Sequence, residues 1–87
     1  MGNHKASLPL STRAVEINET ALGPHHPTTA TSLDQLAQLH KQMGNHKVAL
    51  SLFKRALEIR EAELGLGHPS TVRTLNDLAS MHKEMGT

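Results

Sequence analysis

The chain repeats itself with a period of 42 residues, and this repeat limits its possible folds more than any other feature. Residues 2–43 align with residues 44–85 without a gap, and about half of the aligned positions are identical. The identical pairs include Gly23 and Gly65, Pro27 and Pro69, and Leu33 and Leu75. A fixed period with matching apolar positions is typical of a solenoid, in which each unit packs only against its neighbours.

Four helices are predicted, at residues 3–22, 28–43, 46–64 and 70–85, because apolar residues recur there at helical spacing. Asn3 is expected to cap the first helix, and Gly23 and Gly44 suit the left-handed conformation that ends a helix. Pro27 is well placed at the first position of the second helix, where a backbone N–H is not needed. The short connections predict antiparallel neighbours, and therefore an all-α stack.

The apolar stripes of these helices give a predicted core. In the first helix the stripe comprises Ala6, Leu10, Ala14, Ile17 and Leu22. In the other three helices the predicted core residues are Leu33, Leu36, Ala37, Ala49, Leu52, Phe53, Ala56, Leu57, Leu75, Leu78 and Ala79. The side chains of His82 and Met85 are also expected to point inward.

Composition excludes several classes of function. The formal net charge is +1 with both signs interspersed, so no basic surface for nucleic acid or for an acidic membrane is expected. No apolar run approaches the roughly 18 residues of a membrane span. The absence of cysteine fits a reducing compartment, and we expect a cytoplasmic location. We find no catalytic motif and no phosphate-binding loop, so we predict neither an enzyme nor a cofactor.

Leu33, Leu36, Ala37 and His40 in the second predicted helix, and His46, Ala49, Phe53 and Ala56 in the third, form a two-helix pattern that resembles the tetratricopeptide repeat. They stand where that consensus has Trp, Leu, Gly and Tyr in its first helix and Tyr, Ala, Phe and Ala in its second. The segment 54–61, followed by Leu64-Gly65 and His68-Pro69, resembles the 42-residue repeats of kinesin light chains and nephrocystin-3-like proteins. The resemblance implies a tetratricopeptide-like solenoid fragment with four antiparallel helices in B-A-B-A order, where A and B are the first and second helix of a repeat.

The resemblance also implies a function. Such arrays bind a peptide segment of a protein partner on the concave face that their A helices line. In this chain the corresponding residues are Thr31, Asp34, Gln35, Gln38, Lys41, Arg73, Asn76, Asp77, Ser80 and Lys83. Asn76 is suited to pairing with a peptide backbone, and Arg73 or Lys83 to pairing with a carboxylate.

Two alternatives remain open at this point. The first and last helices each lack a partner that a complete repeat would supply, so the chain is expected to self-associate, with the fourth helix of one copy docked on the first helix of another. The seven histidines allow a remote alternative, a metal site. Four of them, His4, His40, His46 and His82, occupy positions where the resembled families carry Tyr, and packing is the favoured interpretation of these four.

Overall fold

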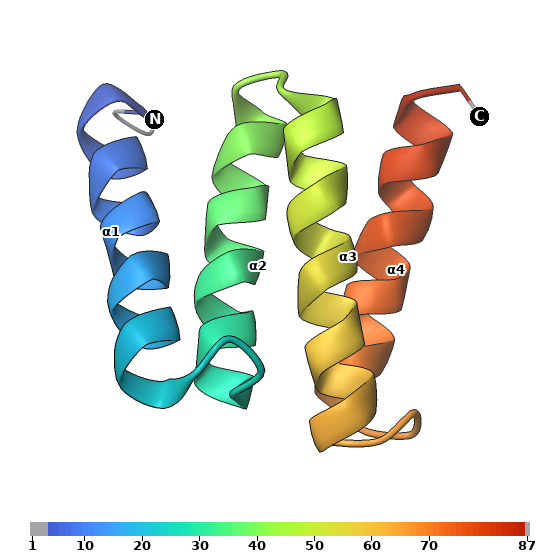
Figure 1. Ribbon diagram of the computed structural model, residues 1–87. Helices are drawn as coiled ribbons and strands as arrows, with labels where there is room; N and C mark the ends of the chain where they lie inside the picture. Colours follow the sequence, from blue (N-terminus) through green and yellow to red (C-terminus); the bar gives the residue numbers. More distant parts are fainter. Residues whose placement is uncertain (1–3, 87) are drawn as a thin grey trace.

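A computed structural model of the chain describes residues 4–86, which form four α-helices and no strand. The helices are α1 (His4–Leu22), α2 (Pro27–Gln42), α3 (His46–Glu63) and α4 (Pro69–Glu84). Every bound lies within one residue of the range expected from the sequence, and the predicted cap at Asn3 lies outside the described residues. Consecutive helices run antiparallel, with α1 and α4 as the two outer helices of a row (Figure 1).

Glycines end the helices in the manner that the sequence indicates. Gly23 has φ +101° and Gly44 has φ +86°, a region that residues with a Cβ rarely adopt. Gly86, one period after Gly44, has φ +74°. Met43 and Met85, which precede these two glycines, have matching backbone angles of φ −83°, ψ −4° and φ −80°, ψ −4°. The backbone therefore leaves α4 with the same local geometry with which it leaves α2.

Each of the two longer connections ends in a histidine that caps the next helix. The Nδ1 atom of His26 accepts a hydrogen bond from the backbone N–H of Thr28 at 3.0 Å, and the Nδ1 atom of His68 accepts one from Ser70 at 3.1 Å. The proline that follows each histidine begins the helix, as expected for Pro27. The residue pattern did not predict that these two histidines cap the helices that follow them.

Buried threonines tie the same connections to the helices that follow. The hydroxyl of Thr29 donates to the carbonyl of Gly23 at 2.9 Å, and the hydroxyl of Thr71 donates to the carbonyl of Gly65 at 2.8 Å. Both threonines are fully buried. Because a buried hydroxyl is stable only when it is hydrogen-bonded, these bonds fix how each loop enters the next helix.

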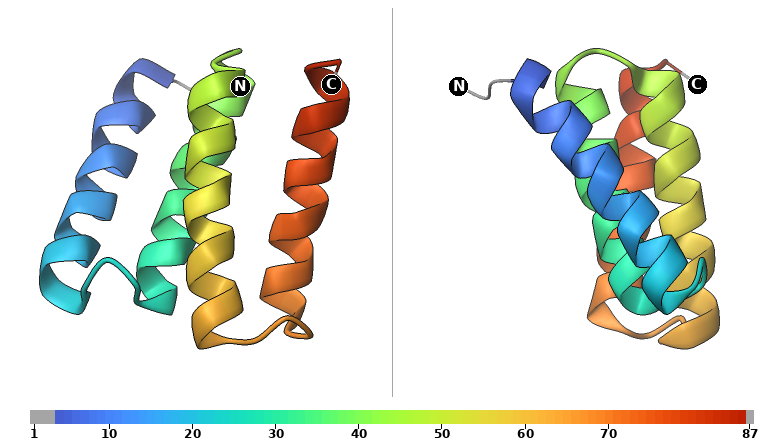
Figure 2. Two further views of the ribbon diagram at one scale, coloured as in Figure 1. Left: turned by 45° about the vertical axis from the view of Figure 1, so that its right-hand side comes forward. Right: turned by 60° about the vertical axis from the view of Figure 1, so that its left-hand side comes forward.

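The apolar core consists of two clusters that meet along α3. One joins α1, α2 and α3 through Val15, Ala30, Leu33, Leu36, Ala56 and Ile59. The other joins α2, α3 and α4 through Ala37, Ala49, Phe53, Leu78 and Met81. Leu52 and Leu57 are half-buried against these clusters, so the inward positions predicted for α2 and α3 are inward in the structure. The views in Figures 1 and 2 show that α2 and α3 stand between the two outer helices.

The predicted core is only partly correct on the outer helices, where Leu78 is buried as expected but several other predicted positions are exposed. Leu75 is 42% exposed and Ala79 and His82 are also exposed, whereas Thr71, Thr74 and Met81 of the same helix are buried. In α1 the buried residue is Val15, while Ala6 is exposed, Leu10 is 66% exposed and Ile17 is 56% exposed. The physical reason is that, among residues 4–86, α1 packs mainly on α2 and α4 mainly on α3, so each outer helix keeps one side that no other helix covers.

Candidate functional site

The ten residues predicted to bind a peptide lie on α2 and α4, and the structure brings the two sets together. The Nε2 atom of Gln38 donates to the Oδ2 atom of Asp77 at 3.4 Å, and the Nζ atom of Lys41 lies 3.6 Å from the Oε2 atom of Glu84. We call the line along which α2 and α4 meet the seam. Because residues three and four apart lie on one side of a helix, the side chains next to these two contacts lie along the seam as well. We call the surface formed by the ten predicted residues the α2–α4 face.

A buried arginine from α3 underlies this face. Arg60 is 6% exposed, and its Nη1 atom lies 3.6 Å from the Oδ2 atom of Asp34. The same guanidinium donates to the hydroxyls of Thr74 on α4 and of Thr31 on α2, the latter at 3.4 Å. One cationic side chain therefore links α2, α3 and α4, and it bridges the two helices that carry the face.

Asp34 does not take the position expected from the sequence. It was predicted to line the binding surface, but it is only 6% exposed, because Arg60 reaches it from α3 and draws it into the seam. Its Oδ1 atom is buried without a hydrogen-bond partner among the described residues. Such an atom carries a desolvation cost. Asp34 therefore acts in the junction between the helices and not as a contact for a ligand.

The exposed members of the face are a different subset. Thr31, Gln35, Arg73, Asn76, Ser80 and Lys83 are exposed, while Gln38, Lys41 and Asp77 are half-buried. On α4 the four exposed residues follow one another at intervals of three and four, so they form a continuous polar row. Of the predicted contacts, α4 supplies most of those that an incoming segment can reach.

The electrostatics of the seam raise the pKa of one carboxyl. Partial burial raises the pKa of Asp77 above its usual value, and the neighbouring charge of Asp34 raises it further. The cations Arg73, Lys41 and Arg60 oppose this shift without cancelling it. The carboxylates of Asp34, Asp77 and Glu84 thus lie near the cations of Lys41, Arg60 and Arg73 where α2, α3 and α4 meet.

Sequence reasoning missed Arg60, although the repeat carries a signal for it. Asn18, one period earlier, donates from its Nδ2 atom to the hydroxyl of Ser32, and Ser32 is the equivalent of Thr74. In both copies, a polar side chain on one helix bonds to a hydroxyl on the next. A polar residue at a matching position in both copies, paired with a hydroxyl 14 residues later, is the pattern that predicts this contact.

The histidines do not gather into a metal site. Within residues 4–86 the structure shows no group of three or more His, Asp or Glu side chains able to hold a metal ion. His46 instead has its Nε2 atom 4.0 Å from the Oε1 atom of Glu84. The Nδ1 atom of His40 lies 3.3 Å from the side-chain Nδ2 atom of Asn45. In the part of the chain that the structure describes, no helix has both the length and the apolar character needed to cross a bilayer.

These features define an α-helical repeat protein with a polar face shared by alternate helices. The sequence profile of the tetratricopeptide repeat matches residues 1–62 and again residues 42–86. The chain therefore belongs to the tetratricopeptide repeat family. Comparison with curated protein sequences finds no significant match. Repeats of this family generally act as non-enzymatic scaffolds in protein–protein interaction.

Proposed function

We propose that the chain binds a peptide segment of a protein partner on the α2–α4 face. The observation that carries this proposal is the exposed polar row of Arg73, Asn76, Ser80 and Lys83 on α4, together with exposed Gln35 on α2. The buried contacts of Arg60 hold the two helices in place beneath this row. A surface that is already fixed loses less conformational entropy on binding, which favours its use as a recognition site.

The chemistry of the row favours an extended segment that carries at least one carboxylate. The amide of Asn76 offers both a donor and an acceptor to a peptide backbone, while Arg73 and Lys83 offer cations at either end of the row. Arg73 is suited to a bidentate contact with a side-chain or terminal carboxylate. Because only two helices contribute, we expect binding to be weak, in the micromolar range or weaker.

A random dodecapeptide library displayed on phage provides a test that needs no known partner. Peptides selected on the folded chain are synthesised, and their affinity is measured by fluorescence anisotropy. We expect Arg73→Ala and Asn76→Ala each to weaken binding by about five- to fiftyfold, the effect of losing one well-placed hydrogen bond to a charged or amide group. Helicity measured by circular dichroism should not change, since both side chains are exposed.

The matched control is Lys54→Ala, which removes an exposed cation from α3 instead. It should leave the affinity within about twofold of the parent value. Selected peptides that are insensitive to Arg73→Ala and Asn76→Ala but sensitive to Lys54→Ala would place the binding surface elsewhere and refute the proposal.

Self-association is a second candidate function, and one observation favours it. Both outer helices present large apolar side chains, namely Leu10 and Ile17 on α1 and Val72 and Leu75 on α4. Contiguous exposed apolar side chains mark interaction surfaces on soluble proteins. Sedimentation velocity over about a hundredfold range of concentration tests this candidate, since a mass-action shift is expected if copies associate.

We further propose that the repeat is of the kinesin light chain and nephrocystin-3-like type, and that the protein works in the cytoplasm without a cofactor or catalytic activity. The 42-residue period and the segment 54–61 support the assignment of type, and the absence of cysteine supports the location. The balanced charge supports protein partners over nucleic acid or an acidic membrane.

A further inference from the structure

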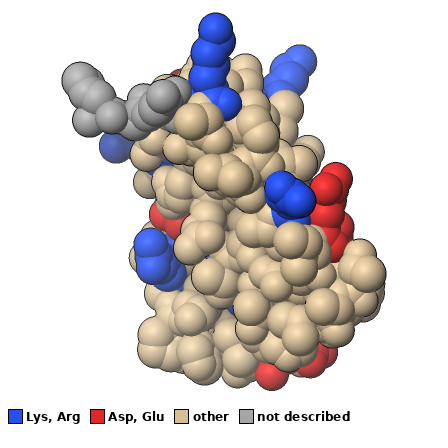
Figure 3. Space-filling model, turned by 90° about the vertical axis from the view of Figure 1, so that its left-hand side faces the viewer, with Lys and Arg blue, Asp and Glu red and all other residues tan. Residues whose placement is uncertain are grey.

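The two outer helices expose apolar faces at opposite ends of the row. On α1, Leu10 is 66% and Ile17 is 56% exposed, and a shallow depression on this helix is lined by Glu16, Ile17, Thr20 and Ala21. Figure 3 shows the α1 side of the molecule, where most of the visible surface is uncharged. On α4, Val72 is 44% and Leu75 is 42% exposed.

The internal repeat shows what covers such faces. One period later, Leu10 and Ile17 correspond to Leu52 and Ile59 of α3, which pack in the cluster that joins α3 to α2. One period earlier, Val72 and Leu75 correspond to Ala30 and Leu33 of α2, which are fully buried in that cluster. The exposed faces of α1 and α4 therefore carry the same kinds of residue as the two sides of the α2–α3 contact.

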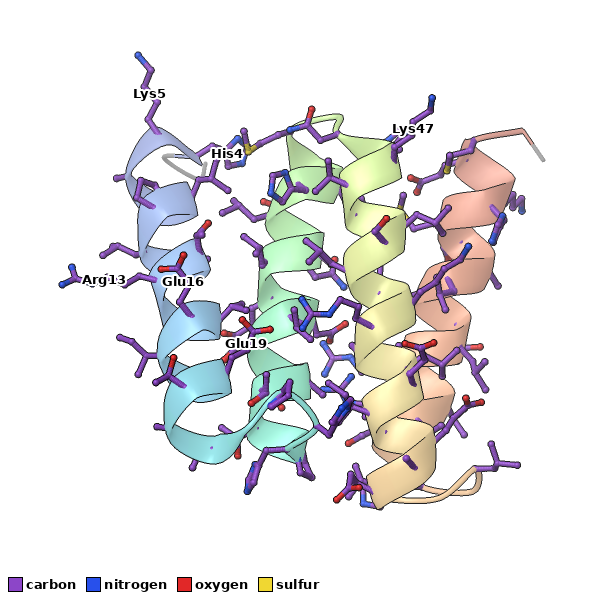
Figure 4. The ribbon with its side chains drawn as sticks, in the orientation of Figure 1. His4, Lys5, Arg13, Glu16, Glu19 and Lys47 are labelled. Atoms are coloured by element: carbon purple, nitrogen blue, oxygen red, sulfur yellow. The ribbon has the colours of Figure 1, made fainter. Side chains whose placement is uncertain are left out.

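An ion pair provides an independent marker of the same geometry. The guanidinium of Arg55 on α3 pairs with the carboxylate of Glu19 on α1, so it bridges two helices one period apart. Both partners are identical in the other copy of the repeat, where they are Arg13 and Glu61. Arg13 is exposed and points away from the other helices, as Figure 4 shows, and Glu61 is half-exposed on α3.

We propose that α1 of a second copy docks on α4 as α3 docks on α2, with Arg13 of the incoming copy beside Glu61 of the first. The contact would then reproduce the Arg55–Glu19 pair between molecules. This mode rests on the self-association proposed above, and it makes that association heterologous, because two different faces meet. A heterologous contact adds copies in one direction and forms rings or filaments according to its rotation.

Two blocked variants reduce the assembly to a single contact. Ile17→Glu places a charge on the α1 face only, and Leu75→Glu places one on the α4 face only. Sedimentation velocity should show the unaltered chain associating with rising concentration, each variant alone as a monomer, and the mixture as a 1:1 heterodimer. Because both side chains are exposed, helicity should be retained; Leu10→Glu and Val72→Glu serve as replacements should either variant lose it.

Charge reversal then tests the register. In the heterodimer the relevant groups are Glu61 of the Ile17→Glu chain and Arg13 of the Leu75→Glu chain. Glu61→Arg in the first chain, or Arg13→Glu in the second, should weaken the heterodimer by about three- to tenfold, and both together should restore it to within about twofold. Lys54→Glu in either chain is the matched control and should have no effect.

The outcomes separate the docking mode from self-association itself. An unaltered chain that stays monomeric at every concentration overturns both, and it assigns the apolar faces to a different occupant. Association of the unaltered chain that survives in either blocked variant alone points to a symmetric contact and overturns the docking mode. A heterodimer that double charge reversal does not restore overturns the Arg13–Glu61 register.

Discussion

Replacing Arg60 with methionine should destabilise the fold strongly, because it leaves Asp34 charged and unpaired in the interior. The Asp34 side chain is only 8% exposed, its Oδ2 atom depends on Arg60, and its Oδ1 atom is already without a partner among residues 4–86. The substitution also removes the bonds from Arg60 to Thr74 and Thr31. Breaking a buried pair by removing one member costs about 3–5 kcal/mol, a large part of the roughly 5–15 kcal/mol that stabilises a typical domain.

Urea unfolding followed by circular dichroism measures this loss. The exposed arginine of the same helix provides a control: Arg55→Met removes only a surface ion pair with Glu19, and it should cost about 1 kcal/mol or less. The double variant Asp34→Leu with Arg60→Met removes both charges together. It should recover most of the loss, since an apolar replacement of a buried ion pair is often neutral or stabilising.

A loss of stability for Arg60→Met no larger than that for Arg55→Met would contradict a buried charge pair at this position. A double variant less stable than Arg60→Met alone would contradict it as well. Either result would mean that Asp34 tolerates its site without Arg60, and that apolar contacts hold α2, α3 and α4 together.

Two further predictions concern single positions. The raised pKa of Asp77 means that the folded state binds its proton more tightly than the unfolded state, so this group lowers stability as pH rises from about its usual value of 3.8 through the raised value. Asp77→Asn should therefore match the parent in urea midpoint at acidic pH and exceed it at neutral pH, and a less stable variant at neutral pH would contradict this. Leu33→Ala, at a fully buried position, should lower the free energy of unfolding by about 2–5 kcal/mol. Leu75→Ala, at the equivalent exposed position, should cost less than half of that. Equal losses would show that α4 is covered on both sides.

The elements of the fold follow from local signals that the sequence carries in full. The glycines after α1 and α2, the prolines that begin α2 and α4 and the apolar spacing each act within a few residues. Helix bounds could for this reason be predicted to within one residue. The resemblance to tetratricopeptide repeats supplied the order of the helices and the identity of the helices that carry the α2–α4 face.

Burial on the outer helices could not be predicted in the same way. Leu75 and Leu33 are identical residues at equivalent positions, and the repeat alone assigns them the same environment. Their exposures differ because α3 covers Leu33, while no helix within residues 4–86 covers Leu75 in the same way. Burial is a property of the neighbouring element and not of the position in the repeat, which is also why Val15 is buried and Ile17 is not.

The sequence predicted which helices carry the candidate site, but not which of its residues are buried between helices and which are exposed. The sequence placed Asp34 and Arg73 on one polar surface, and the structure shows Asp34 in the seam and Arg73 exposed. What decides between the two roles is the reach of Arg60 from a third helix. A pattern read along one helix does not contain that information, because it depends on how helices pack across the sequence.

The matching geometry at Gly44 and Gly86 has a consequence for building longer chains. A segment that follows Gly86 begins from the same backbone geometry as α3 does after Gly44. Joining Gly86 directly to Asn3 of the next copy would recreate the internal order Gly44-Asn45-His46 and keep the 42-residue period, whereas a fusion of full copies inserts Thr87, Met1 and Gly2 at each junction. The number of repeats in such an array would then depend only on how many copies are joined.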